Sequence, residues 1–390
     1  MKVLHLAAGN LYGGVERLLT TFARHRQVRL QAEFGVCFEG LLASELRALG
    51  ASVHILGGVR ASRPITIIHA RRKLRQLLRE RRIDVVLCHA TWPLAVFGPV
   101  VLSSSDVSLV CWMHDATTGR HWIDRWARRS VPSLIIHNSR YTRDRSRRLF
   151  PNTRSEVIYC PVEAPLSLAS SETTALVRRE LKTPLDATVV IQVGRMESWK
   201  GHLLHLEALQ NLAHLPNWIC WMVGGPQRPF EEVYFERLRQ FAAKKGIADR
   251  VRFAGFRTDV PRLLAAADIF CQPNSGPEPF GVVFAEALLA GLPVVTTAIG
   301  GALEIVDSSC GILFAKDDVE GLTTALRQLF DDCELRTRLG RAAPQRAGAV
   351  CDPQNQNARL AELLGEVVEQ SKCATRPRSA GGLDLSLDRR

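Results

Sequence analysis

The chain has 390 residues, of which 46% are hydrophobic, and it carries a formal net charge of +12. This length favours two domains, and this composition is typical of a globular protein and excludes a disordered or fibrous one. The ten cysteines include no Cys-x-x-Cys pair, so neither a zinc site nor a disulfide framework is indicated, and reduced thiols in a cytoplasmic protein are expected.

The first part of the chain alternates short apolar strand patterns with helical patterns. Strands are expected at residues 2–8, 33–38, 52–56, 84–89, 108–113, 134–138 and 156–159. Helices are expected at residues 15–25, 41–49, 67–82 and 140–149. This alternation predicts a Rossmann-like α/β domain over residues 1–165, with a parallel sheet covered on both faces. No signal peptide is expected, and the longest apolar stretch, residues 91–102, is too short to cross a bilayer.

The periodicity is weak over residues 166–186, which are expected to form a linker with a short helix. After residue 186 the alternation of strand and helix patterns begins again. Strands are expected at residues 187–193, 218–223, 251–254, 269–272 and 293–297, and helices at residues 202–212, 231–245, 260–266, 281–290, 319–329 and 355–369. The pattern predicts a second Rossmann-like domain over residues 187–350, facing the first across a cleft. Residues 351–370 are expected to form a helix that can pack back on the first domain, and residues 371–390 a disordered tail.

One acid stands out in the second domain. Glu286 lies within an otherwise apolar helical pattern, where a carboxylate is costly to bury unless it accepts hydrogen bonds. Taken alone, such a residue is more often partly exposed or ion-paired. A second acid, Glu278, precedes it in a Gly/Pro loop after a strand, and the helix begins near Phe280, Gly281 and Val282. A helix N-terminus in this position suits a diphosphate, with a ribose diol at Glu286.

Further candidates follow other strands of the same predicted sheet. Gly194 and Arg195 end one strand, and Lys200 comes just before a helix, where a cation is favourable only if an anion lies beside it. Arginine suits phosphate oxygens, although both cations can equally be solvated surface charges. Gly225, after the next strand, would let a flat base approach the backbone, which is a weak signal alone. Ligands of open parallel sheets bind beyond the carboxyl ends of the strands, where these loops would meet.

The first domain offers fewer candidates. Gly13 and Gly14 follow its first strand and open a helix, which is a possible phosphate approach but also a common turn. His114 ends a strand and is followed by Asp115, whereas His89 ends the preceding strand. An isolated histidine of this kind is more often a satisfied core residue, and His114 is favoured because of its acidic neighbour and its place at the cleft edge.

Together these segments resemble the retaining family 4 glycosyltransferases of the GT-B fold. The segment from Glu278 to Glu286 is similar to the family's E-x7-E signature. The other matching segments are Gly13-Gly14-Val15-Glu16, His114-Asp115, Asn138-Ser139 with Tyr141, Val157-Ile158-Tyr159 with Pro161, Gly194-Arg195 with Lys200-Gly201, Gly291-Leu292-Pro293-Val294, and Gly300-Gly301 with Glu304. The resemblance covers about residues 1–350 and departs at Pro279, where a glycine is frequent, so no backbone donor exists there.

The resemblance implies a role for each matching residue. Arg195 and Lys200 would neutralise the donor diphosphate, Glu286 would hold the ribose, and Glu278 would contact the donor sugar. The backbone N–H groups of Phe280 and Gly281 would support sugar and phosphate, His114 would touch the sugar near the reacting centre, and Gly14 would close over the phosphates. Transfer with retention of configuration, by front-face attack rather than through a covalent Glu278 adduct, is also implied.

The residues are consistent with a transfer that uses no metal ion and no cofactor. Negative charge builds on the departing diphosphate, and two cations with a helix N-terminus can stabilise it. No Asp-x-Asp triplet occurs in the chain. Alternatives are a nucleotide-sugar epimerase or a phosphorylase on the same scaffold, a nucleic-acid-binding protein, for which no recognition motif is present, and a non-catalytic scaffold, which intact site residues oppose.

The positive charge is confined to the first domain. Residues 1–162 contain 25 lysines and arginines and 11 acids, a net of +14, whereas the remainder has a net of −2. Arginines 71, 75, 79 and 82 fall on one arc of a helix beside Leu74, Leu77 and Leu78, and Trp122 and Trp126 lie among further arginines. Such faces suit an anionic membrane surface that presents a glycan or lipid-linked acceptor, unless the leucines and tryptophans simply pack inward.

Overall fold

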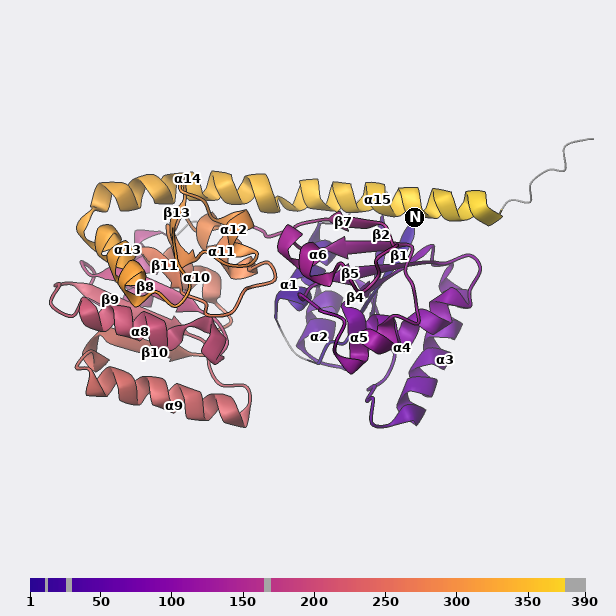
Figure 1. Cartoon of the computed structure of the whole chain (residues 1–390), viewed down its shortest axis with the longest axis horizontal. Coiled ribbons are helices and arrows are strands. Elements are labelled where there is room, and N and C mark those ends of the chain that lie inside the picture. The colour runs from indigo at the N-terminus through magenta and orange to yellow at the C-terminus, as the bar shows by residue number, and fades with distance from the viewer. Residues whose placement is uncertain (11–12, 26–29, 165–169, 376–390) are drawn as a thin grey trace, which may run out of the picture.

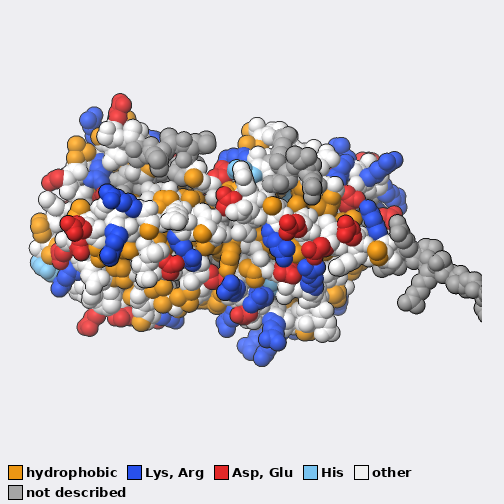
Figure 2. All heavy atoms as spheres, turned by 90° about the horizontal axis from the view of Figure 1, so that it is seen from above, with side chains coloured by type: hydrophobic (Ala, Val, Ile, Leu, Met, Phe, Trp, Pro, Cys, Tyr) orange, Lys and Arg blue, Asp and Glu red, His pale blue; other side chains and the backbone are white. Residues whose placement is uncertain are grey.

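The computed structural model describes residues 1–10, 13–25, 30–164 and 170–375. It contains two α/β lobes side by side, spanned along one edge by two long helices in line, α14 (Cys333–Cys351) and α15 (Pro353–Thr375) (Figure 1). Seen from above, the lobes are separated by a narrowing (Figure 2). The prediction of two Rossmann-like domains with parallel sheets is confirmed.

The N-terminal domain is built on a seven-stranded parallel sheet of order β3-β2-β1-β4-β5-β6-β7. Its strands are β1 (Lys2–Ala7), β2 (Gln31–Val36), β3 (Ser52–Ile55), β4 (Val85–His89), β5 (Ser108–Met113), β6 (Leu134–His137) and β7 (Ser155–Val157). Its helices are α1 (Gly14–Arg24), α2 (Leu41–Ala48), α3 (Pro64–Arg81), α4 (Thr91–Leu102), α5 (Trp122–Ala127) and α6 (Arg140–Ser146). The strand order reverses between β1 and β4, the point where such sheets open a ligand crevice.

The C-terminal domain has a six-stranded sheet of order β10-β9-β8-β11-β12-β13, with its own reversal between β8 and β11. Its strands are β8 (Thr188–Val193), β9 (Trp218–Val223), β10 (Val251–Gly255), β11 (Ile269–Gln272), β12 (Val294–Thr297) and β13 (Gly311–Phe314). Its helices are α7 (Ser171–Glu180), α8 (His202–Asn211), α9 (Pro229–Lys244), α10 (Val260–Ala265), α11 (Val282–Leu289), α12 (Ala302–Ile305) and α13 (Val319–Asp331), with 3-10 turns η1 (Ser198–Lys200) and η2 (Ala248–Arg250).

Both faces of the N-terminal sheet are buried, as the continuous apolar strands require. On β5, Leu109 and Cys111 pack in one cluster with α3 and α4, whereas Val110 and Trp112 pack in another with α1 and α2. Because side chains alternate across a strand, the two clusters lie on opposite faces of the sheet. This packing holds the carboxyl ends of the strands rigid for the loops that follow them.

Helices α4 and α14 and strand β13 are among the elements that were not predicted from the sequence. Helix α4 is apolar nearly all round because it is buried between α3, α5 and the sheet, so it shows no amphipathic period. Helix α14 contains Gly340 and Pro344, which lower helix propensity, but a Cβ at Gly340 would lie 2.5 Å from the Gly291 carbonyl oxygen, so tertiary packing requires the glycine there. Strand β13 has four residues and pairs only with β12.

The chain crosses between the domains at two places that touch each other. The amide of Val162 donates to the Cys351 carbonyl oxygen at 3.0 Å, joining the first crossing to the break between α14 and α15. Helix α15 then lies on the N-terminal domain, where Arg154 reaches Glu366 at 2.8 Å. It continues through residues 371–375, so the expected disorder of that segment is wrong, and residues 376–390 lie outside the described part of the chain.

Candidate functional site

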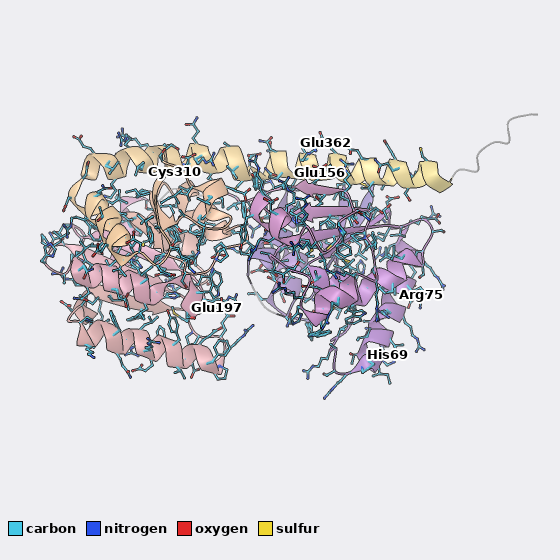
Figure 3. The ribbon with its side chains drawn as sticks, viewed as in Figure 1. His69, Arg75, Glu156, Glu197, Cys310 and Glu362 are labelled. Carbon is cyan, nitrogen blue, oxygen red and sulfur yellow. The ribbon has the colours of Figure 1, made fainter. Side chains whose placement is uncertain are left out.

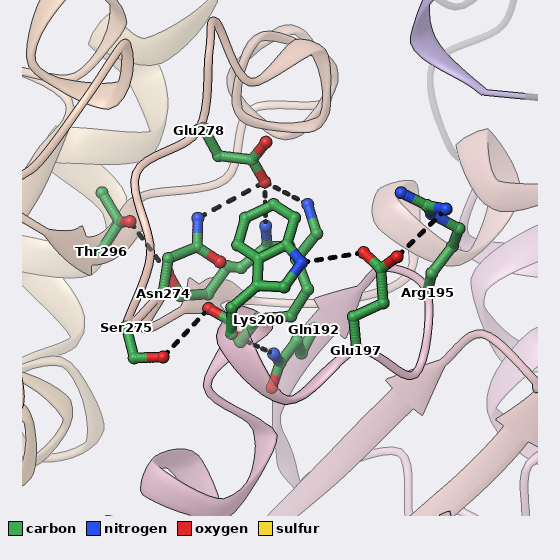
Figure 4. Close-up of polar contacts among 10 residues, drawn as sticks. Gln192, Arg195, Glu197, Lys200, Asn274, Ser275, Glu278 and Thr296 are labelled. Atoms are coloured by element: carbon green, nitrogen blue, oxygen red, sulfur yellow. Dashed lines mark hydrogen bonds and ion pairs between the residues drawn. The ribbon is translucent and has the colours of Figure 1, made fainter. Parts of the chain in front are cut away.

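The loop before α11 carries a buried carboxylate surrounded by donors. Glu278 is 7% exposed, and its Oε1 accepts from Lys200 Nζ, from Gln272 Nε2 at 3.1 Å and from Asn274 Nδ2 at 3.4 Å (Figure 4). The donors come from the loop after β8, from the end of β11 and from the loop after it. Since β8 and β11 are parallel neighbours, their carboxyl ends meet at one edge of the sheet. The predicted neighbourhood of Glu278 and Lys200 is therefore present as an ion pair.

The backbone around Lys200 is held by a glycine that no other residue could replace without movement. Gly201 has a φ of +74°, and a Cβ there would lie 1.7 Å from the Pro273 carbonyl oxygen. The Lys200 carbonyl accepts from Gln192 Nε2 at 2.8 Å, and its ammonium group lies 4.1 Å from the centre of the Trp199 ring. The backbone contacts fix the Lys200 main chain, and the Trp199 ring lies against the ammonium group that pairs with Glu278.

Arg195 is not part of this cluster. Its guanidinium lies 3.1 Å from Glu197 Oε1, while Glu197 Oε2 accepts from Trp199 Nε1 at 2.9 Å (Figure 4). Arg195 is 41% exposed, so it can leave Glu197 for an incoming anion at little cost. The sequence did not single out Glu197, although an acid two residues after a candidate phosphate ligand is a readable signal.

The glycine loops of the second domain close on one another. A Cβ at Gly224 would meet the Gly194 carbonyl oxygen at 1.9 Å, and one at Gly225 would lie 3.1 Å from the Phe256 amide nitrogen. The loops after β8, β9 and β10 therefore touch. The sequence placed the first two at one edge of the sheet, and the approach of a base to Gly225 stays a prediction. Here the glycines allow close contact between loops.

Glu286 has a partner that the sequence did not reveal. Its carboxylate is 14% exposed and lies 2.5 Å from Nη1 of Arg17, which belongs to α1 of the other domain. Burial raises the pKa of the Glu286 carboxyl, and the Arg17 guanidinium opposes that shift. Arg17 lies one turn after Gly14, and this spacing was the available signal. In this structure the Arg17 guanidinium pairs with the carboxylate that was predicted to bind a ribose.

The start of α1 faces the start of α11 across the domain boundary. A Cβ at Gly14 would lie 3.8 Å from Val282 Cγ2, and Gly13 is the N-cap residue of α1. A cavity of about 420 Å³ lies between the domains, and Gly14, Arg17, Val282 and Glu286 are among its lining residues. Two helix N-termini thus lie together beside an interdomain cavity, an arrangement suited to an anion.

The backbone before α11 is free to receive a ligand. Gly281, the N-cap residue of α11, has a φ of +100°, and Phe280 is 2% exposed, with its ring stacked on Tyr159 at 5.7 Å between centroids. Within the described ranges, no group accepts from the N–H of Phe280 or Gly281. These amides therefore remain available donors at the head of the helix.

His114 lies at the end of β5 and is linked to the same loop. It is 7% exposed, and burial lowers the pKa of its imidazole to about 3, so the ring is neutral at physiological pH. Its carbonyl oxygen accepts from Asn138 Nδ2 at 3.1 Å, and Asn138 Oδ1 accepts from Thr142 Oγ1. The Thr142 backbone N–H donates to Ser139 Oγ at 2.9 Å, and Ser139 Oγ donates to the Pro279 carbonyl oxygen. A continuous set of hydrogen bonds therefore connects the His114 backbone to the loop of Glu278.

Glu304 joins the two domains. Its carboxylate accepts from the amides of Arg140 and Tyr141, both at 2.9 Å, and from the Tyr159 hydroxyl at 3.0 Å. Ser139 Oγ adds a bond to the Pro279 carbonyl oxygen at 2.5 Å. Several segments that carried the family resemblance, among them Tyr141 and Glu304, thus form the domain contact. Among the described residues, no three histidine, cysteine or acidic side chains gather as a metal ion would require.

Comparisons with known proteins agree with this geometry. The profile of the family described as "Glycosyl transferases group 1" matches residues 174–346, and that of "Glycosyltransferase Family 4" matches residues 12–164. The lipopolysaccharide core biosynthesis glycosyltransferase LpsE of Rhizobium meliloti is 37% identical over 167 residues, which are 42% of this chain and 46% of that protein. The match thus spans about half the length of that relative.

Longer similarities cover both domains. The GDP-mannose-dependent alpha-(1-6)-phosphatidylinositol monomannoside mannosyltransferase of Mycolicibacterium smegmatis is 29% identical over 310 residues, or 75% of this chain and 79% of that protein. The crystal structure of Anabaena Alr3699/HepE in complex with UDP superposes with a TM-score of 0.82 at 26% identity, covering 94% of this chain and all of that one. With both sheets, both family profiles and the site segments in agreement, the chain belongs to the group 1 and family 4 glycosyltransferases of the GT-B fold.

Proposed function

We propose that this protein transfers a sugar from a nucleotide diphosphate to a glycan or lipid-linked acceptor, with retention of configuration and without a metal ion. The observation that carries the proposal is the interdomain cavity at which Gly14, Val282 and Glu286 meet. The similar proteins support these substrates: HepE was crystallised with UDP and with UDP-glucose, and LpsE is a glycosyltransferase of lipopolysaccharide core biosynthesis.

In the proposed complex, ribose hydroxyls donate to Glu286 and displace Arg17. Arg17 is 37% exposed, so its guanidinium can swing toward solvent or toward the donor phosphates. The diphosphate lies at the N-terminus of α11, near the amides of Phe280 and Gly281 and the starting turn of α1 at Gly14. Arg195 leaves Glu197 to reach a phosphate oxygen.

The sugar is proposed to lie between Glu278 and His114. Glu278 Oε1 is already occupied by its three donors, which leaves Oε2 to accept from sugar hydroxyls. As the anomeric carbon separates from the phosphate oxygen, negative charge grows on the diphosphate beside Lys200. The acceptor oxygen attacks the same face of the sugar and passes its proton to the departing phosphate. Fixed cations and helix N-termini supply the charge that a metal ion would otherwise provide.

The donor site can be tested by thermal unfolding with nucleotides. UDP, GDP and ADP and their glucose or mannose derivatives are added to the full-length chain. A ligand that binds only the native state stabilises it by about 2.7 kcal/mol at 100 times its Kd, so one nucleotide is expected to raise the melting temperature by a few degrees.

A matched pair of variants locates the binding. Glu286→Gln removes the acceptor for the ribose diol and should strongly reduce the shift, whereas Glu232→Gln on the exposed side of α9 should not. The absence of a shift with every nucleotide, or an equal shift in both variants, would contradict the donor site. Epimerised sugar or sugar phosphate formed without an acceptor would instead indicate an epimerase or a phosphorylase.

The acceptor is proposed to dock on the N-terminal domain at an anionic membrane surface. The structure corrects one part of the sequence interpretation: Leu74, Leu77 and Leu78 are buried against the sheet and cannot contact lipid. The outer side of α3 instead presents Ile65 and Ile68, which are 65% and 48% exposed. His69 and Arg75 lie on this outlying helix, far from Glu197 (Figure 3).

A second exposed apolar group accompanies the arginines in and around α5. Trp122 is 47% exposed and its ring stacks on Trp126 at 6.2 Å between centroids. Within the described chain, no helix combines the length and the apolar content needed to cross a bilayer. Peripheral contact, through basic side chains with a few apolar ones, is therefore the membrane association that we propose, at the cytoplasmic face.

Vesicle flotation tests this surface. The protein is expected to float with vesicles containing phosphatidylglycerol at low salt and to be released by salt, because the attraction is electrostatic. The double variant Arg75→Glu, Arg79→Glu should bind less, whereas Arg237→Glu, Arg239→Glu on α9 makes the same charge change on the other domain and should bind normally. Equal binding by both variants, or no flotation at all, would favour an acceptor free in solution.

A further inference from the structure

Three histidines form a hydrogen-bonded row through the N-terminal sheet. His5 Nδ1 lies 3.0 Å from His89 Nε2, and His89 Nδ1 lies 2.9 Å from His114 Nε2. The rings come from β1, the end of β4 and the residue after β5, and they stack with centroids 5.3 and 5.2 Å apart. They are 1%, 3% and 7% exposed, so the row leads from the interior toward the cleft edge. From the sequence His89 was expected to be a core residue, and no role was predicted for His5.

All three rings are neutral at physiological pH. Burial lowers the pKa of His5 and of His114 to about 3, and burial together with its two histidine neighbours holds the pKa of His89 well below its usual value. A neutral imidazole has one N–H donor and one bare nitrogen acceptor. Two hydrogen bonds in a row therefore allow only two arrangements: either every ring carries its proton on Nδ1, or every ring carries it on Nε2.

The buried end of the row decides between them. His5 Nε2 is buried and has no partner among the described residues. The Phe34 and Phe22 rings beside it are inclined by only 23° and 34° to the imidazole. An N–H in the imidazole plane cannot point at the face of a ring that is nearly parallel to it, so no N–H···π contact would satisfy a proton on Nε2.

Two states of His5 Nε2 are compared: a buried N–H without an acceptor, and a buried bare nitrogen without a donor. The N–H without an acceptor is rarer and costlier, because a strong donor then loses its hydrogen bond to water. The proton of His5 consequently belongs on Nδ1, from which it is donated to His89 Nε2. The same reasoning puts the His89 proton on Nδ1, donated to His114 Nε2. The remaining proton of His114 must then also lie on Nδ1.

We propose that His5 and His89 are positioning residues that hold His114 in the Nδ1–H tautomer, so that its free ring nitrogen presents a hydrogen-bond donor and not a base. The inference rests on the proposed function only in taking a sugar oxygen as the acceptor. The row ends at the unpartnered His5 Nε2 among phenylalanine rings, so it has no outlet for a proton. It orients His114 and carries no proton away from the site.

Ring nitrogen NMR of the full-length chain, labelled with ¹⁵N-histidine and without ligand at neutral pH, tests the tautomer directly. We expect the His114 Nδ1 signal at a protonated, pyrrole-type shift and Nε2 at a bare, pyridine-type shift, with the signals assigned by their loss in His114→Gln. His114 with its proton on Nε2 in the unmodified protein would overturn the inference, whatever the enzyme transfers.

Two substitutions of the remote histidine provide a matched comparison. His5→Met places a thioether sulfur, which can accept but cannot donate, beside His89 Nε2 and should therefore draw the His89 and His114 protons to Nε2. His5→Leu offers neither a donor nor an acceptor, so His89 Nε2 stays bare as His5 Nε2 is now, and the Nδ1–H tautomer of His114 should be kept. Turnover is expected to fall roughly tenfold or more in His5→Met, with a smaller change in donor KM, and to change little in His5→Leu. An unchanged His114 tautomer in His5→Met would also overturn the proposal. A preserved Nδ1–H tautomer without any glycosyl transfer would refute the proposed function alone.

Discussion

Replacing Lys200 by alanine is expected to reduce the turnover number by roughly 10²-fold or more, because a preorganised charge at the departing diphosphate is lost. In the free protein this ammonium is only 13% exposed and pairs with Glu278. Its position is set by Gly201 and by the Gln192 side chain, so no rearrangement is needed when charge develops. Arg195→Ala should also lower the turnover number, since the Arg195 guanidinium is proposed to reach a phosphate oxygen of the same diphosphate.

The rate is measured as release of nucleoside diphosphate from the sugar nucleotide that gives the largest thermal shift. Lys316→Ala is the matched control, because Lys316 is 52% exposed in the same domain and, within the described part of the chain, pairs only with its neighbour Asp317. Folding should survive in Lys200→Ala, since Gln272 and Asn274 still donate to Glu278. Near-normal rates in both the Lys200 and the Arg195 variants would contradict the proposal that these two side chains stabilise the departing diphosphate.

Replacing Arg178 by alanine is expected to lower the free energy of unfolding of the C-terminal domain by about 3 kcal/mol or more, because several buried partners lose their donor. Arg178 is 6% exposed on α7. Its guanidinium donates to the carbonyl oxygens of Ala266, Leu185 and Ala187 at 3.2, 2.8 and 2.9 Å, and to Asp268 at 2.9 Å. It thereby fastens the segment that enters the domain to β8 and α10.

The unfolding transition can be followed in urea by tryptophan fluorescence. Trp221 reports locally, because its Nε1 donates to Thr183 Oγ1, a few residues after Arg178. Arg179→Ala is the control: this neighbour on the same helix is exposed, so its loss should change stability by less than about 0.5 kcal/mol. Equal midpoints for the two variants would show that the buried hydrogen bonds of Arg178 do not stabilise the domain.

Most of the fold was predictable because its signals are local. Strands such as β5 and β9 are continuous apolar runs, and helices such as α1 and α9 combine an apolar face with a polar one, so a short window of sequence is sufficient. Helix α14 escaped prediction because Gly340 and Pro344 weaken its propensity, whereas Gly291 and Arg346 hold it in place. Arg346 donates to the Ile305 and Glu304 carbonyl oxygens, which lie about forty residues away in sequence.

The amino-acid sequence by itself determined that Glu278, Glu286, Arg195 and Lys200 follow strands of one sheet, because parallel strands bring their carboxyl ends to the same edge. Only the tertiary structure decided what these groups contact. Arg17 reaches Glu286 from the other domain, Glu197 holds Arg195, and His5 adjoins His89 through pairing of β1 with β4. The Arg195–Glu197 pair is local, but the contacts of Arg17 and His5 join residues that lie far apart in the sequence. No periodicity within a single segment records how such distant segments pack together.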